Sequence, residues 1–244
     1  MAPSLHIGCA GWALRKENAA IAPPPGSHLE RYARRFNAVE INSTFYRPHK
    51  RTTFERWADS VPTHFRFSVK MPKAITHGGR LANADASLAR FLDEVGALGE
   101  KLGPLLIQLP PSLAFDKHVA EAFFSGLRKR FPGQVVCEPR HDAWFSRSAT
   151  SLLRKFHISR VGADPAPIDA AARPAGYGGI AYYRLHGTPR MYYSAYQAGE
   201  LRELAMRCRR QIARGLDIWC IFDNTAAGAA LDNAAELQDL LKSV

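Results

Sequence analysis

The residues most suited to chemistry are polar side chains at the ends of short apolar segments. The segment VEINSTFYRP (residues 39–48) places Glu40 between Val39 and Ile41, which are typical of a buried strand. An unpaired carboxylate in such a strand costs several kcal/mol, so Glu40 needs partners from elsewhere in the fold. Because alternate residues of a strand point to opposite faces, Glu40 and Asn42 share the face that Val39 and Ile41 leave free.

Six other short apolar segments also end in polar side chains. These are Lys70, Gln108, Glu138, Asp164, Arg184 with His186, and Asp223 with Asn224. In a ring of parallel strands such side chains converge on one mouth, where the active sites of α/β barrels lie. Two carboxylates among cations can have pKa values pushed apart, giving a general base and a general acid. A structural network of salt bridges that plugs the ring is the alternative.

The elements that position these residues alternate along the chain. Candidate strands cover residues 5–8, 38–42, 65–70, 104–109, 134–138, 158–164, 181–185 and 217–222, with amphipathic helical patterns between them. Their spacing is typical of strand–helix units. It predicts an α/β fold, a TIM-type (β/α)8 parallel barrel, as a single domain over residues 1–244. The crossover at residues 165–180 is the exception, because three prolines and three glycines prevent a full helix there.

Two helix starts carry capping-box signatures, Ser27 with Glu30 and Thr52 with Glu55. The first precedes an apolar stripe that includes Leu29. The last helix is expected over about residues 226–241.

Composition narrows the class of protein. Lysine and arginine number 33 against 22 acidic residues, giving a net charge of +11, which favours anionic partners. No apolar run reaches the roughly 18 residues of a membrane span, and the first residues lack a secretion signal. Cys9, Cys137, Cys208 and Cys220 form no CxxC pair, so we expect packed, reduced thiols in a cytoplasmic protein. The oligomeric state is left open.

Six long motifs resemble those of a known family. They are VEINSTFYRP, FRFSVKMPKAITHGGRL, LGPLLIQLPPSLAFD, CEPRHDAWF, YYRLHGTPRMYYSAY and IFDNTAAGAALDNA, in this order between about residues 5 and 241. The chain is similar to the YecE-like family of domains of unknown function. The resemblance implies a TIM-type barrel with a charged pocket at its mouth and no particular activity. Pro139 and Asp223 depart from the phenylalanine and asparagine that many members carry there.

The resemblance and the strand ends together suggest site residues. The catalytic candidates are Glu40, Glu138 and Lys70, and the candidates for substrate binding are Asn42, Tyr46, Gln108, Arg140, Trp144, Arg184, His186 and Asp223. Arg140 and Arg184 suit bidentate binding of a carboxylate or phosphate. Tyr46 and Trp144 either stack on a ring of the substrate or pack within loops.

We expect no metal and no cofactor. A divalent site built from Glu40, Glu138, His186 and Asp223 is the alternative, but nearby Lys70 and Arg184 would repel a dication. The sequence lacks GxGxxG and GxxxxGK[ST] after a strand, and it lacks a GxSxG nucleophile elbow.

These observations predict an enzyme that uses acid–base chemistry on a small anionic substrate, phosphorylated or carboxylated. A nucleic-acid-binding or nucleic-acid-processing protein is one alternative, and a non-catalytic ligand sensor is another. The segment HGTPRMYYSAY, with Arg190, Tyr192, Tyr193 and Tyr196, is either a lid or stacking platform, or a loop pinned by buried tyrosine rings.

Overall fold

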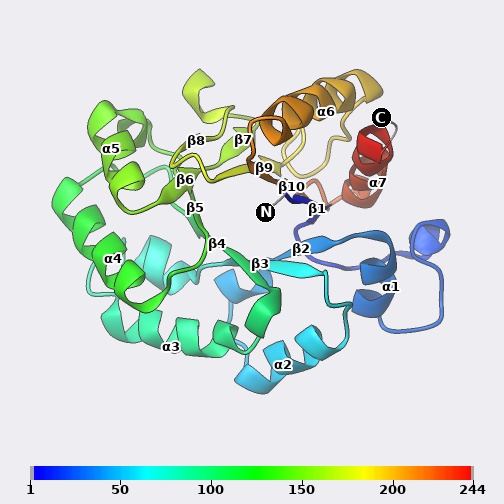
Figure 1. Cartoon of the computed structure of the whole chain (residues 1–244), viewed down its shortest axis with the longest axis horizontal. Coiled ribbons are helices and arrows are strands. Elements are labelled where there is room, and N and C mark those ends of the chain that lie inside the picture. Colours follow the sequence, from blue (N-terminus) through cyan, green and yellow to red (C-terminus); the bar gives the residue numbers. More distant parts are fainter. Residues whose placement is uncertain (1–2, 243–244) are drawn as a thin grey trace.

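In the computed structural model, which describes residues 3–242, the strands lie inside and the longer helices surround them (Figure 1). The strands are β1 (Leu5–Cys9), β2 (Ala38–Ile41), β3 (Arg66–Lys70), β4 (Leu102–Gln108), β5 (Val135–Glu138), β6 (Ile158–Arg160), β7 (Gly162–Asp164), β8 (Ala175–Gly176), β9 (Ile180–Leu185) and β10 (Asp217–Phe222). The α-helices are α1 (His28–Arg35), α2 (Arg51–Asp59), α3 (Asp85–Gly96), α4 (Lys117–Arg130), α5 (Arg147–Lys155), α6 (Ala198–Ile212) and α7 (Ala229–Lys242). Short helical turns cover Lys16–Ala20, Ser43–Phe45, Ala74–Gly78, Gly99–Lys101, Asp142–Phe145 and Asp169–Ala171.

The strands form two hydrogen-bonded sheets. One has the order β1-β10-β9-β7 and the other β2-β3-β4-β5-β6-β8. All pairs are parallel except that of β6 with β8. The predicted α/β fold with parallel strands is therefore confirmed, whereas the backbone ladders do not join into one closed ring.

At the first seam, between β1 and β2, side chains replace the ladder. Asn37 accepts from the Ile7 N–H and donates to the Leu5 carbonyl, and the Tyr32 hydroxyl accepts from the Cys9 N–H and donates to the Ala38 carbonyl. Above them, one parallel bridge links Ala10 to Glu40. The two sheets are thus held together where no regular ladder forms between them.

At the second seam the chain itself passes from one sheet to the other. β6 pairs with β5, while β7 pairs with β9, and only Val161 separates β6 from β7. The predicted strand at residues 158–164 is therefore two short strands in different sheets. The crossover at residues 165–180 contains one helical turn and β8 but no α-helix, as its prolines and glycines predicted.

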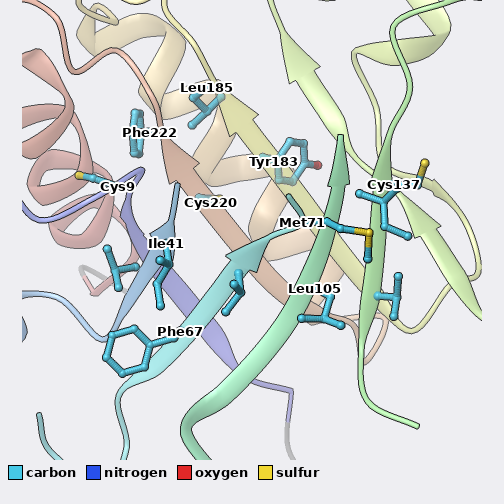
Figure 2. Close-up of a cluster of buried hydrophobic side chains, with 14 of the residues drawn as sticks. Cys9, Ile41, Phe67, Met71, Leu105, Cys137, Tyr183, Leu185, Cys220 and Phe222 are labelled. Carbon is cyan, nitrogen blue, oxygen red and sulfur yellow. The ribbon is translucent and has the colours of Figure 1, made fainter. Parts of the chain in front are cut away.

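Two groups of apolar side chains stabilise this arrangement. An interior cluster consists of Ala38, Leu106, Val136, Val161, Ile180, Tyr182, Trp219 and Ile221, which come from strands of both sheets and from the residue joining β6 to β7. The larger core lies between the strands and the helices, and Figure 2 shows Ile41, Phe67, Leu105 and Cys137 from successive strands within it. The strands therefore bury both faces.

Two sequence features of the helices had different outcomes. Ser27 and Glu30 form the predicted capping box at the start of α1. The box predicted at Thr52 and Glu55 is wrong, because α2 begins at Arg51 after Lys50, which makes no side-chain cap.

All four cysteines are free and buried, as expected. None of the described helices is long and apolar enough to cross a membrane.

The side-chain bridge at the first seam makes a prediction about stability. Tyr32→Phe removes the hydroxyl and leaves the buried Cys9 N–H without its acceptor, which costs about 1–3 kcal/mol. For a chain of this length the melting temperature falls by roughly 2–4 °C per kcal/mol. The half-exposed Tyr193, changed to Phe, is the control and should melt with the wild type. Equal melting of Tyr32→Phe and the control would show that the bridge contributes nothing.

Candidate active site

A layer of polar side chains lies at the carboxyl ends of the strands, next to the interior cluster. This polar layer consists of Glu40, Lys70, Gln108, Glu138, Arg184, His186 and Asp223, which β2, β3, β4, β5, β9 and β10 supply from their last residues or from the residues that follow directly. All seven are buried. The structure therefore brings together most of the residues that the strand ends predicted.

Arg184 lies at the centre of this layer, with 0% of its side chain exposed. Its Nε and Nη2 donate to the two oxygens of Glu40, at 3.0 and 2.7 Å. Nη1 donates to Glu138 Oε2 at 2.7 Å, and Nη2 also donates to Asp223 Oδ2 at 3.1 Å. One guanidinium thus joins three carboxylates that β2, β5 and β10 supply.

His186 and Arg140 complete the network on the side of β5 and β9. His186 Nδ1 is 3.0 Å from Asp223 Oδ2, and Nε2 is 3.5 Å from Glu138 Oε1. Arg140 donates through Nε and Nη2 to Glu138 Oε1, at 3.0 and 2.9 Å. Both oxygens of Glu138 are therefore bound to cationic groups.

The pKa values of this network follow from burial and pairing. Burial raises the pKa of Glu138, but Arg184, His186 and Arg140 outweigh it and hold that pKa well below its usual range. The same balance, with burial against Arg184 and His186, lowers the pKa of Asp223. Burial and Arg184 lower the pKa of His186, yet its hydrogen bonds to Asp223 and Glu138 leave the pKa raised. Glu138 and Asp223 are therefore ionised at neutral pH.

Glu40 lies at the bottom of the layer and has no access to solvent. Besides Arg184, the Tyr182 hydroxyl lies 3.0 Å from Glu40 Oε2 and 2.8 Å from Ser68 Oγ. Tyr182 also belongs to the interior cluster, so Glu40 is fixed between apolar packing and Arg184. The buried carboxylate in the segment VEINSTFYRP is therefore tolerated because Arg184 and Tyr182 bind its two oxygens.

Lys70 differs from the other ions of the layer. It is 5% exposed, and its Nζ lies 4.1 Å from the centroid of the Phe45 ring. Within residues 3–242, no oxygen accepts a hydrogen bond from Nζ or forms an ion pair with it. Burial, and then the charge of Arg184, lower its pKa to about 8.

Two hollows open beside the polar layer. One, of about 250 Å³, is lined by Glu138, Arg140 and His186 together with Pro111 and neighbouring loop residues. The other, of about 600 Å³, lies beyond the ends of β1, β2 and β10, where Asn42 and Trp12 line it. The Oδ1 atom of Asn42 is buried without a hydrogen-bond partner among the described residues.

Two predicted site residues lie elsewhere. Tyr46 is 75% exposed and lines a separate hollow with Pro72 and Phe91, on the outer side of the loops after β2 and β3. Trp144 is 1% exposed, and its Nε1 donates to the Leu113 carbonyl. Trp144 therefore packs within the loops, and neither ring joins the polar layer.

The loop after β9 lies against the layer. The Tyr196 hydroxyl accepts from the Gly187 N–H and donates to the Asp164 carbonyl, so this buried tyrosine pins the loop. Tyr192 packs edge-on against His186, with the ring centroids 5.8 Å apart. Arg190 lies 4.0 Å from the ring centroid of Tyr193, which is half-exposed. The loop is thus pinned at Tyr196 and covers His186 with Tyr192.

The sequence interpretation missed Tyr182, Thr44 and Phe45. Tyr182 shares a strand face with Arg184 and His186, so its position two residues before Arg184 was an available signal. Thr44 donates to the Lys70 carbonyl at 2.6 Å and fixes the end of β3. The stacking of Phe45 on Lys70 has no sequence signal, because the two lie on different strand–loop units.

Comparison with known proteins now supplies the family. The family model described as "Protein of unknown function DUF72" matches residues 6–244. The chain belongs to this family. The resemblance read from the six motifs is thereby confirmed.

Individual relatives agree with this assignment. The UPF0759 protein YecE of Escherichia coli K12 is 33% identical over 150 residues, which cover 59% of this chain and 54% of that protein, so the match spans only about half of this relative. The UPF0759 protein YunF of Bacillus subtilis is 23% identical, with 97% of this chain and 94% of that protein covered.

Solved structures of the family share the fold. A DUF72 family protein of Enterococcus faecalis V583 has a TM-score of 0.82 at 19% identity and covers 98% of this chain and 96% of its own. Another, from Thermotoga maritima, has a TM-score of 0.80 at 23% identity, with 98% and 100% covered. At these identities the likeness shows the fold alone.

The central position of Arg184 makes a prediction about pH. Arg184→Met leaves three buried carboxylates without their shared cation, which should cost about 3–5 kcal/mol at pH 7. Without the guanidinium, burial raises the pKa values of Glu138 and Asp223, so these two carboxylates take up protons as the pH falls and lose their repulsion. In the wild type both pKa values are lowered from 4.5 and 3.8, so their contribution to stability persists at pH 5 and is lost only in stronger acid. The deficit of the variant should therefore shrink between pH 7 and pH 5 in urea unfolding.

The control is Arg160→Met. Arg160 is a buried arginine that contacts the Phe145 ring and Thr150 and pairs with no carboxylate of the described chain. Its deficit should stay constant over the same pH range. If the loss of unfolding free energy in Arg184→Met were equally constant with pH, the ion network of Arg184 with the three carboxylates would be contradicted.

Proposed function

We propose that this chain is an enzyme that performs acid–base chemistry on a small phosphorylated or carboxylated substrate at the mouth of a TIM-type barrel. The order of strands supports the barrel: pairing runs from β2 to β6, passes through Val161 to β7, and continues through β9 and β10 to β1. The bridges at the first seam then link β1 to β2. In barrels of this type the carboxyl ends of the strands carry the active site.

The observation that carries the proposal is the Lys70 ammonium without an acceptor. The carboxylates of the polar layer are bound by Arg184, Arg140 and His186, whereas no described oxygen is bound to Lys70 Nζ. A buried cation without a partner is costly, and an anionic substrate would remove that cost. We therefore assign Lys70 to binding negative charge on the substrate.

The same lysine suits proton transfer. A pKa of about 8 lies near the pH at which most enzymes operate, where a general acid or base is most effective. Asp223 supplies a carboxylate nearby, since only its Oδ2 is bound to Arg184 and His186. Lys70 and Asp223 are thus the pair that we assign to proton transfer.

Glu40 and Glu138 take a different role in this proposal. Every oxygen of both residues is bound by a cation, and Glu40 is sealed from solvent. They hold Arg184 and Arg140 in place, and because Arg184 is fully buried they act on the substrate through the partly exposed Arg140. Gln108 and Asn42 remain our candidates for contacts with neutral parts of the substrate.

The two alternatives predict different ligands. A nucleic-acid-binding protein would use the net charge of +11 and the half-exposed Tyr193 beside Arg190, and its binding would weaken steeply with salt. A sensor would bind the same small anion without turnover. We favour the enzyme because a lysine with a pKa near neutrality serves proton transfer and is unnecessary for binding alone.

The proposal predicts stabilisation by small anions. Malonate or inorganic phosphate at about a hundred times its dissociation constant should add roughly 2.7 kcal/mol, or some 5–10 °C in melting temperature. Lys70→Met should lose most of this increase. Its own melting temperature without ligand should equal or exceed the wild-type value, because a buried cation without an acceptor has been removed.

Lys73→Met is the matched control, since Lys73 is exposed and lies three residues away. It should respond to both anions as the wild type does, and glycerol should stabilise all three proteins equally. Turnover is then sought by screening phosphorylated and carboxylated compounds against wild type and Lys70→Met. Stabilisation only by oligonucleotides would overturn the proposal, and so would equal responses of the two lysine variants.

A further inference from the structure

We infer that Lys70 is a nucleophile that forms a covalent imine with a small oxo acid, a compound with a carbonyl carbon next to an anionic group. This inference rests on the proposed function and narrows its substrate class.

The placement of Lys70 suits attack on a carbonyl group. Thr44 Oγ1 donates to the Lys70 carbonyl, so the backbone is fixed where β3 ends at the mouth. The Phe45 ring lies against the ammonium and forms an apolar wall on one side. Nζ has no hydrogen-bond partner in the described chain and is not among the described atoms that are fully buried without one, so a small part of its surface reaches solvent although Lys70 is only 5% exposed. The amine is therefore both positioned and accessible.

Lys101 shows what a structural lysine looks like in this protein. Its Nζ donates to the Ala58 and Val61 carbonyls, at 2.5 and 2.6 Å. These bonds tie the end of α2 to the start of β4. Lys70 has no such bonds, and burial lowers its pKa to about 8. A neutral amine is the nucleophilic form, and desolvation is a known way to expose it.

The charges around Lys70 favour a substrate that carries an anion beside its carbonyl group. Arg140 lines the hollow of about 250 Å³ together with Glu138 and His186, and its side chain is 22% exposed. Lys70 does not line this hollow itself but interacts electrostatically with Glu138, which does. In the proposed complex a carboxylate of the substrate pairs with Arg140 and the adjacent carbonyl carbon reaches Lys70. The size of this hollow suits a compound of few carbon atoms.

The reaction balances without a further reactant. The Lys70 ammonium releases a proton, and the neutral amine adds to the carbonyl carbon to give a carbinolamine. The carbinolamine then expels hydroxide, which takes up the released proton and leaves as water. One C=O bond is replaced by one C=N bond, and the positive charge of the ammonium reappears on the protonated imine. This charge draws electrons from the neighbouring carbon, where Asp223 could remove a proton.

The test traps the imine by reduction. Full-length protein is incubated at pH 7 with pyruvate or glyoxylate and sodium cyanoborohydride, which reduces an imine to a stable secondary amine. Intact mass and peptide mapping then locate the adduct. At this pH a lysine with a pKa near 8 has on the order of a hundredfold more neutral amine than an ordinary lysine. The adduct should therefore form at Lys70 at least about tenfold faster than at exposed Lys73, and its rate should saturate with pyruvate.

Two variants complete the design. Lys70→Met should lose the rapid adduct, and Lys73→Met should keep it. Acetone, which has a carbonyl group but no anion, should label Lys70 much more slowly than pyruvate. Adducts that spread over the exposed lysines, without preference for Lys70, would overturn the inference.

The same samples separate this inference from the proposed function. If malonate and phosphate stabilise the wild type through Lys70 but no adduct forms, the imine is wrong and the acid–base site stands. If neither stabilisation nor an adduct depends on Lys70, both are wrong.

Discussion

The structure depends on one buried guanidinium. Arg184 binds Glu40, Glu138 and Asp223, so it joins β2, β5 and β10 through β9, across both sheets. A buried ion network of this kind contributes little net stability compared with apolar packing, because desolvation offsets the attraction. Its consequence is specificity: the three carboxylates share one cation only when all four strand ends meet in the observed arrangement. The network therefore fixes the geometry of the mouth, where the chemistry is proposed.

The side chains on either side of Arg184 are arranged around the same buried ion network. The interior cluster excludes water on one side of Arg184, and Tyr182 connects that cluster to Glu40 through its hydroxyl. On the other side, His186 shares Asp223 Oδ2 with Arg184, and Arg140 binds the oxygen of Glu138 that Arg184 leaves free. Lys70 then contacts the Phe45 ring and lies near charged side chains, but no described oxygen accepts a hydrogen bond from its Nζ. A side chain that the fold leaves unsatisfied in this way is best explained by a ligand.

The sequence predicted those parts that depend on local pattern. Alternation within β9 placed Arg184 and His186 on one face, and the apolar segments placed the strands to within about two residues of the observed ends. It did not predict the break at Val161, because β6 and β7 differ only in their partners, β5 and β9. The catalytic role of Glu40 stays a prediction, and a strand pattern could not show that Arg184 and Tyr182 bind its oxygens. The positions of Tyr46 and Trp144 depended on loop packing, which leaves no periodic signal.

The most direct test of this account is the pKa of Lys70 in the folded protein. Lysine labelled with ¹³C at Cε gives one NMR signal per residue, and the signal missing from Lys70→Arg assigns Lys70. The account predicts that this signal titrates near pH 8, well below the value of about 10.4 for a lysine in a model peptide. Addition of malonate should raise the pKa of Lys70, because a bound anion favours the ammonium. A Lys70 signal that titrates with the other lysines and ignores malonate would contradict the account.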